Sequence, residues 1–105
     1  MFRDDRPYLL RSPRSKPART VPLGHVVMTQ GVAADVPPDE ILTALRRHAR
    51  ADWGEVPLAD QRANDRALES GERLLSAYRT RAGVKFWIIT EADRSSTCVL
   101  LPGEY

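Results

Sequence analysis

Bulky apolar side chains are concentrated in the last third of the chain, where they follow one another as in consecutive β-strands. Two short polar turns, at 81–83 and 92–94, divide this region into three runs. The three predicted strands cover approximately residues 73–80, 84–91 and 97–101. Connections this short make neighbouring strands antiparallel, so the C-terminal third is predicted to form a meander.

The central run of this meander is apolar on both sides. Phe86 and Ile88 share one face of a strand, and Trp87 and Ile89 share the other. One face is expected to pack under helices, and the other to be covered by the N-terminal segment, another subunit or a partner.

Three further elements precede the meander. Residues 23–29 are predicted to form a strand, because β-branched residues lie between two glycines. A helix is predicted to start within 35–40, where two prolines and two acidic residues suit a first turn, and to continue with apolar residues at helical spacing to about Ala49. A second helix is predicted over 58–70, closed by Gly71.

The resulting order is β-α-α-β-β-β. It predicts an α+β fold with a four-stranded, mainly antiparallel sheet and two helices packed on one face. Residues 22–105 are assigned to this single domain, a size that allows one modest core.

Residues 1–21 differ from the rest in composition and charge. They are rich in proline and arginine and are predicted to form a flexible arm. Residues 1–20 carry six basic and two acidic side chains, whereas the remaining residues carry ten basic and twelve acidic ones. The net charge of +2 therefore reflects the arm, and the domain itself is slightly acidic.

Basic side chains of the arm and of the first helix form a candidate nucleic-acid surface, since arginine and lysine supply affinity for phosphate. The residues are Arg3, Arg6, Arg11, Arg14, Lys16, Arg19, Arg46, Arg47 and Arg50.

No set of residues predicts catalysis, a cofactor or a metal site. His25 and His48 lie far from the single cysteine, Cys98, and a zinc site needs about four such ligands. Cys98 lies in an apolar run and is interpreted as a core residue. Ser95 and its polar neighbours are interpreted as turn formers rather than as a nucleophile with a base. No membrane-spanning or signal segment is evident, and one cysteine fits a reducing compartment, so a cytoplasmic location is expected.

Aromatic and polar residues around the second helix are the candidates for partner binding. Trp53 follows a helix end beside a glycine, where it either packs at the core edge or forms an exposed aromatic anchor. The candidate residues are Trp53, Asp52, Asn64, Asp65 and Trp87.

With these residues set out, the chain resembles a family of small bacterial proteins carried on plasmids and integrated mobile elements. The resemblance covers residues 22–105 and rests on Asp52-Trp53-Gly54, on Asp60 and Asn64, and on the segments 73–78, 87–95 and 100–105. Such proteins are often labelled only as plasmid-related, and sometimes loosely as restriction-system components. The resemblance implies a genetic setting but supplies no catalytic motif.

Three functions are weighed. The first is a non-enzymatic protein-binding accessory of a mobile element, acting on a host or element-encoded protein, with inhibition of a host defence complex as one form and a homodimer as another assembly. The second is a nucleic-acid-binding module led by the basic arm. The third is a small ribonuclease-type toxin, by analogy of fold; Arg79, Arg81, Lys85 and Arg94 would supply only the positive part of a cleft that also needs an acid–base pair.

Overall fold

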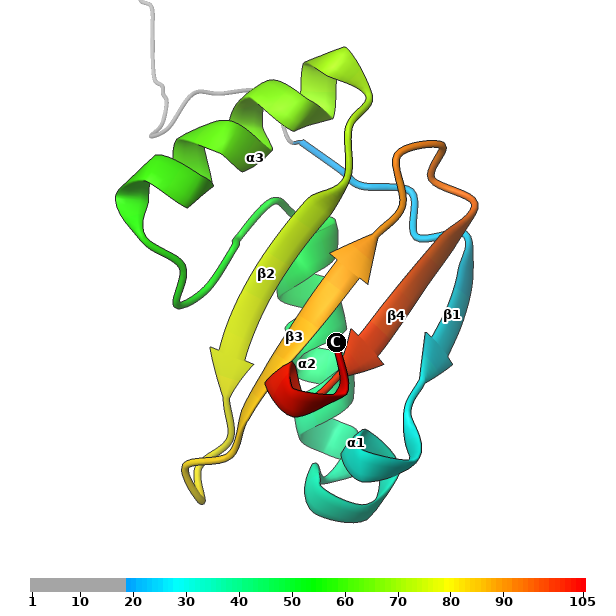
Figure 1. Ribbon diagram of the computed structural model, residues 1–105, viewed down its shortest axis with the longest axis vertical. Helices are drawn as coiled ribbons and strands as arrows, with labels where there is room; N and C mark the ends of the chain where they lie inside the picture. Colours follow the sequence, from blue (N-terminus) through cyan, green and yellow to red (C-terminus); the bar gives the residue numbers. More distant parts are fainter. Residues whose placement is uncertain (1–18) are drawn as a thin grey trace, which may run out of the picture.

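The computed structural model describes residues 19–105, which form a four-stranded sheet with helices on one face and at one edge (Figure 1). The strands are β1 (His25–Met28), β2 (Leu74–Arg79), β3 (Lys85–Thr90) and β4 (Ser96–Leu100). The helices are α1 (Gln30–Asp35), α2 (Pro38–Ala49), α3 (Leu58–Ser70) and a terminal 3-10 turn, η1 (Pro102–Glu104). The predicted α+β class is confirmed, and the predicted arm lies outside the described residues except for its last positions.

The sheet is mixed, with strand order β1-β4-β3-β2. The β2–β3 and β3–β4 pairs are antiparallel, as the meander pattern predicts. β1 lies beside β4 and runs parallel to it, with His25 opposite Ser96 and Met28 opposite Val99. This pairing makes β1 and β2 the two outer strands.

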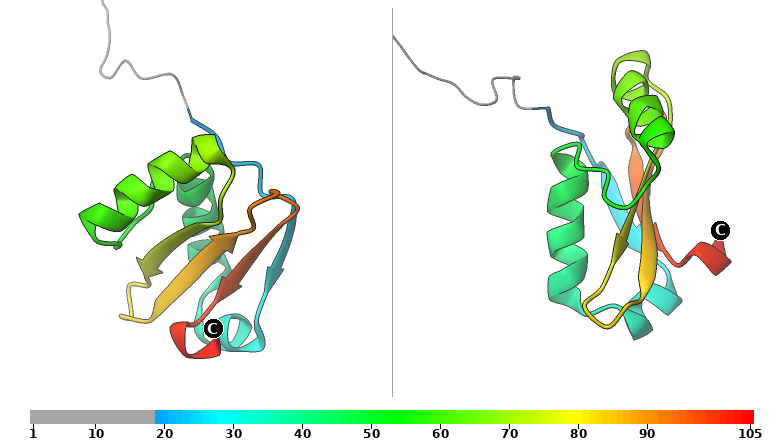
Figure 2. Two further views of the ribbon diagram at one scale, coloured as in Figure 1. Left: turned by 45° about the horizontal axis from the view of Figure 1, so that its top comes forward. Right: turned by 90° about the vertical axis from the view of Figure 1, so that its left-hand side faces the viewer.

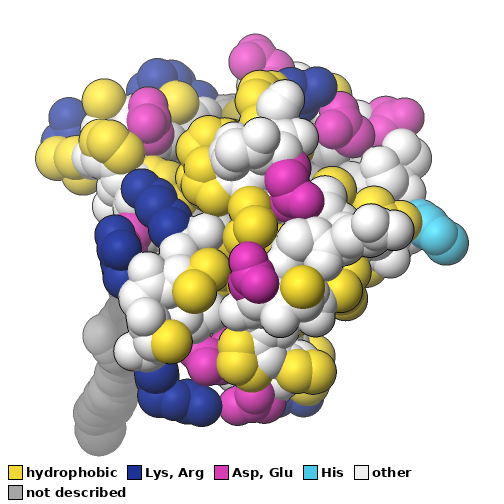
Figure 3. Space-filling model, turned by 60° about the horizontal axis from the view of Figure 1, so that its bottom comes forward, with side chains coloured by type: hydrophobic (Ala, Val, Ile, Leu, Met, Phe, Trp, Pro, Cys, Tyr) yellow, Lys and Arg dark blue, Asp and Glu magenta, His cyan; other side chains and the backbone are white. Residues whose placement is uncertain are grey.

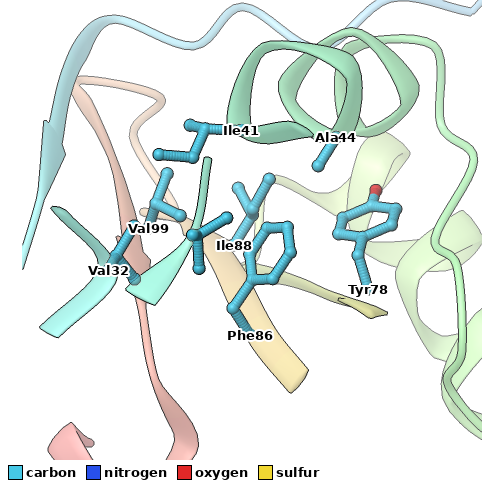
Figure 4. Close-up of a cluster of buried hydrophobic side chains, with 8 residues drawn as sticks. Val32, Ile41, Ala44, Tyr78, Phe86, Ile88 and Val99 are labelled. Atoms are coloured by element: carbon cyan, nitrogen blue, oxygen red, sulfur yellow. The ribbon is translucent and has the colours of Figure 1, made fainter. Parts of the chain in front are cut away.

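The main core lies between α2 and one face of the sheet (Figure 4). Ile41 and Ala44 of α2, Val32 of α1 and Val36, which caps α1, meet inward side chains of the strands. The strand residues of this cluster are Tyr78, Phe86, Ile88 and Val99. β1 contributes no side chain to the buried members of this cluster, so α2 leaves the β1 side of the sheet uncovered.

The two predicted helices cover different parts of the sheet. α2 lies across a face, whereas α3 lies at the β2 edge and the adjoining end of the sheet (Figure 2). This placement differs from the predicted arrangement of both helices on one face. Its physical basis is the thin apolar stripe of α3, which buries Ala67 in a second cluster with Trp53, Val56 and Leu74.

Each long helix ends as its sequence predicts. Pro37 caps α2 and Pro38 is its first residue, and Asp39 and Glu40 lie in its first turn, where carboxylates complement the helix dipole. Gly71 closes α3 in a left-handed conformation, with φ of 79°. α1 was not predicted, because a helix of only six residues has too little periodicity to be recognised.

α1 and η1 are held together by one carboxylate. Glu104 accepts hydrogen bonds from the hydroxyl of Thr29 (2.5 Å) and the amide of Gly31 (3.2 Å) at the start of α1. The same carboxylate accepts from the amide of Leu101 (2.8 Å). These bonds hold the pKa of Glu104 below its usual value, the Thr29 bond most strongly. The chain end is thereby fixed beside the end of β1.

None of the helices within residues 19–105 is long and apolar enough to cross a membrane.

Candidate functional site

The predicted anchor Trp53 is buried, with only 4% of its surface exposed. Its indole N–H donates to Asp65 on α3 (3.0 Å), and its ring meets the edge of the His48 ring at a centroid distance of 5.6 Å. Asp52 accepts two hydrogen bonds from Arg47, at 2.7 and 3.2 Å, which lower the pKa of the carboxyl group. The structure supports the core-edge interpretation of Trp53 over the exposed anchor.

The side chain of Asn64 makes the backbone hydrogen bonds that a further strand would make at the β2 edge. Its side-chain amide donates to the carbonyl of Leu75 (2.7 Å), and its side-chain oxygen accepts from the amide of the same residue (3.2 Å). Two residues along, Ala77 donates to the carbonyl of Trp53 (3.1 Å) and accepts from the amide of Glu55 (2.7 Å). The outward backbone groups of Leu75 and Ala77, in the middle of β2, are therefore satisfied within the chain, which protects this part of the edge from pairing with other proteins.

Trp87 lies on the sheet face opposite α2, where it is partly buried. Its ring contacts Tyr105 edge-on at 5.8 Å, and the Tyr105 hydroxyl accepts from Arg73 (2.9 Å). The chain's own C-terminus thus covers part of the second apolar face. Together with the preceding contacts, this shows that all five predicted partner-binding residues hold elements of the same chain together.

The predicted nucleic-acid residues fall into two groups. Arg3, Arg6, Arg11, Arg14 and Lys16 lie outside the described residues. Among those described, Arg19 pairs with Asp65 (3.1 Å), and Arg47 pairs with Asp52 and lies over the Tyr78 ring at 4.9 Å. Arg46 and Arg50 are exposed on α2. On the face seen in Figure 3, basic and acidic side chains form separate small groups among apolar and uncharged ones, so no continuous basic surface covers it.

Three of the four residues proposed for a ribonuclease cleft are engaged in structural contacts, and the fourth, Lys85, is exposed on β3. Arg79 pairs with Glu55 (3.3 Å), and Arg81 lies 3.5 Å from both Asp39 and Glu40. The guanidinium of Arg94 donates to three backbone carbonyls, two of them at the end of α3. The residues are Ala67, Glu72 and Glu91. The charges of Arg79 and Arg81 are thus compensated, and Arg94 fastens the end of α3 to the β3–β4 turn.

A buried hydrogen-bond network centred on His48 was not predicted from the sequence. Nδ1 of His48 lies 2.5 Å from the Ser76 hydroxyl, and Nε2 lies 2.8 Å from the Thr90 hydroxyl. Thr90 continues to Thr97 (2.8 Å), whose hydroxyl donates to the carbonyl of Leu23 (2.7 Å). The four side chains are completely buried. The sequence feature that could have indicated this network is the presence of Ser and Thr at inward strand positions that otherwise hold apolar residues.

The direction of each hydrogen bond in this network follows from the bond between Thr97 and the carbonyl of Leu23. Thr97 gives its proton to a carbonyl, so it accepts from Thr90, and Thr90 in turn accepts from Nε2–H of His48. Nδ1 is then unprotonated and accepts from Ser76. Every side chain of the network has a hydrogen-bond partner when His48 is neutral. Burial, and to a lesser extent the positive charge of Arg94, lowers the pKa of His48 to about 4.

This arrangement is suited to holding α2 on the sheet rather than to catalysis. The Ser76–His48 pair resembles a nucleophile with its base, but it is closed off from solvent, and the Thr90 hydroxyl occupies the position where a carboxylate would orient the base. Cys98 is partly buried, and burial raises the pKa of its thiol, which disfavours the reactive thiolate. Within residues 19–105, no group of three His, Cys, Asp or Glu side chains is placed to hold a metal ion.

The turn before β4 has the predicted structural role. The Asp93 carboxylate accepts from the amide of Ser95 (3.0 Å), and Arg94 adopts a left-handed conformation, with φ of 62°. The polar residues here therefore form a turn.

The remaining candidate is an exposed apolar surface at the β1 side of the sheet, here termed the β1 surface. It consists of Val26, Val27 and Met28 on β1 and Leu42 on α2, which are 40, 44, 49 and 48% exposed. These are four of the six exposed large hydrophobic residues in the described part of the chain; the other two are Leu58 and Tyr105. Val26 and Met28 lie on the α2 side of the sheet and Val27 on the other side, so the exposed apolar groups flank the β1 edge, a distribution typical of an interaction site.

A groove between β1 and α2 forms part of this surface. It has a volume of about 370 Å³ and an almost entirely aliphatic lining. The lining residues are Met28, Ala33, Val36, Pro38, Ile41, Leu42 and Leu45. Val26 and Met28 point to the same side of the sheet, because they lie opposite Thr97 and Val99, whose side chains face α2.

Comparison with protein-family models, with curated proteins and with solved structures found no match.

Proposed function

We propose that the chain is a non-enzymatic protein-binding protein, and that the β1 surface is where it binds. The observation that carries this proposal is the contrast between the two outer strands. The β2 edge is closed by Asn64 and by residues 53–55, whereas no element within residues 19–105 pairs with the outer side of β1. Proteins ordinarily cover or charge a sheet edge, so an apolar edge left open is a site for strand addition.

The chemistry of the surface indicates the kind of partner. An extended segment paired with β1 gains main-chain hydrogen bonds, and its alternate side chains reach the groove beside Leu42. The aliphatic lining favours apolar side chains in that segment. The partner is accordingly proposed to be a protein, either of the host or encoded by the same genetic element.

The biological setting of this proposal rests on the resemblance of residues 22–105 to mobile-element proteins. On that resemblance the protein is proposed to act as an accessory factor in the bacterial cytoplasm, with inhibition of a defence complex as one outcome of binding.

Leu42→Glu is expected to abolish capture of the partner when the tagged protein is used as bait in its host cells. The substitution places a charge in the aliphatic groove at a position that is 48% exposed, so the fold is retained. Leu58→Glu is the matched control, because Leu58 is 59% exposed and lies at the start of α3, where a carboxylate is favourable. Quantitative mass spectrometry of the captured proteins distinguishes the two variants. Equal capture by wild type and both variants would exclude the β1 surface as the binding site.

A further inference from the structure

The backbone of β1 presents hydrogen-bonding groups to its open side at alternate residues. The amide of His25 donates to Ser95 (2.9 Å) and the amide of Thr29 donates to Val99 (3.0 Å), both toward β4. In a parallel ladder alternate residues face the same neighbour, so Val27 also faces β4. The N–H and C=O groups of Val26 and Met28 therefore point away from the sheet.

These outward groups are self-complementary. In an antiparallel pair of two β1 strands centred on Val27, Val26 of each copy lies opposite Met28 of the other. Both residues face outward, so each such pair exchanges two N–H···O bonds. Val27 then lies opposite its own counterpart as a non-hydrogen-bonded pair, as its bonding to β4 requires. This register uses all outward groups of the strand, which has only four residues.

The side chains match as well. A twofold axis perpendicular to the sheet keeps α2 of both copies on one face, where Val26 of one copy meets Met28 of the other. Val27 meets its counterpart on the opposite face. β1 contains no carboxylate, lysine or proline, the residues that ordinarily prevent edge pairing.

From these observations we infer that the first occupant of the β1 edge is a second copy of this chain, which joins the two sheets into one. This inference rests on the proposed function of the β1 surface as a binding site. A C2 contact of this kind is the commonest symmetry of protein assemblies. A second copy and an extended segment of a different protein would compete for β1, because both would pair with the outward groups of Val26 and Met28.

The predicted dimer is weak. A four-residue strand and a few flanking side chains bury less than the roughly 1,200 Å² typical of the smallest stable interfaces. Association is therefore expected at concentrations of about 10 μM to 1 mM, which correspond to about 4–7 kcal/mol of binding free energy.

Sedimentation velocity of the full-length chain over this range tests the inference through a charge exchange at the twofold axis. Val27→Lys and Val27→Glu each place like charges opposite one another and are expected to weaken dimerisation at least tenfold. An equimolar mixture of the two variants is expected to recover the wild-type dimer fraction, because the charges are then opposite. Leu58→Lys, away from β1, serves as the control and retains wild-type association.

Two results would overturn the inference. One is a wild-type chain that stays monomeric up to about 1 mM. Residues 1–18 or a different protein would then be the occupant of the edge in place of a second copy. The other is a dimer that Val27→Lys leaves unchanged or that the mixture fails to recover. If either variant does not fold, concentration-dependent protection of the Val26 and Met28 amides in the wild type gives the same decision. A monomer whose partner capture still depends on Leu42 would remove the second copy but retain the proposed function.

Discussion

Acidification from pH 7 to pH 4 is expected to reduce the free energy of unfolding by about 3 kcal/mol through His48 alone. Burial holds the pKa of His48 at about 4 in the folded chain, against an ordinary value of 6.5. The unfolded chain therefore binds a proton first as the pH falls, and the stabilising contribution of neutral His48 is complete above about pH 6.5. It is lost progressively down to about pH 4, and each unit of pKa difference corresponds to about 1.4 kcal/mol.

The physical reason is the order of donors around the ring. Protonation at Nδ1 would set a donor against Ser76, whose hydroxyl would have to turn its own proton elsewhere in a site with no solvent. The ring is also packed against Trp53 and lies within the field of Arg94. Charge on the ring is thus disfavoured from every side.

Urea unfolding at pH 7, 6, 5 and 4 measures this loss. His48→Gln retains polar atoms but does not titrate, so its stability at pH 7 is lower while its pH dependence is shallower than that of the wild type. His25→Gln is the matched control, because it removes a histidine from an exposed position on β1. Identical pH dependence in the wild type and His48→Gln would show that the buried hydrogen-bond network around His48 does not cause the acid sensitivity.

Gly54→Ala is expected to destabilise the fold by more than about 3 kcal/mol, the range of severe single substitutions. Gly54 has a φ of 71°, and an added Cβ would lie inside contact distance of the Ala77 carbonyl and within 2.8 Å of the Tyr78 ring. These atoms belong to β2, whose outer edge is hydrogen-bonded to residues 53–55. Relief of the overlap would have to separate this segment from β2.

Gly71→Ala supplies the comparison. Gly71 has a φ of 79°, but no atom lies within 4 Å of an added Cβ, so only backbone strain of about 1 kcal/mol is expected. Chemical denaturation of the two variants separates strain from steric overlap. Equal losses in the two variants would mean that the close approach at Gly54 contributes nothing.

Much of the fold was predictable because its signals are local. α3 has the predicted bounds, since Gly71 marks its end, and the strands of the meander differ from prediction by about one residue at each end. The parallel pairing of β1 with β4 was not predicted, because it joins segments about 70 residues apart in sequence and no turn specifies it. The placement of α3 depended on Asn64, a polar residue whose pattern resembles that of a solvated helix face.

The candidate site was less predictable for the same reason. Trp53 and Trp87 have the residue type of binding anchors, but their partners, Asp65 and Tyr105, lie in other parts of the same chain. Conversely, residues 25–28 form an ordinary short strand in the sequence. Their exposure follows only from their position at the end of the strand order, where α2 does not reach.

Residue-resolved amide exchange along β1 shows whether this strand is a binding edge. The amides of Val26 and Met28 are expected to exchange rapidly in dilute protein and to become protected as concentration rises or a protein partner is added. The amide of Val27, already bonded to β4, should stay protected throughout. Val26 and Met28 amides that exchange at the same rate at every concentration, with and without the proteins captured in the host, would contradict the assignment of β1 as a binding edge.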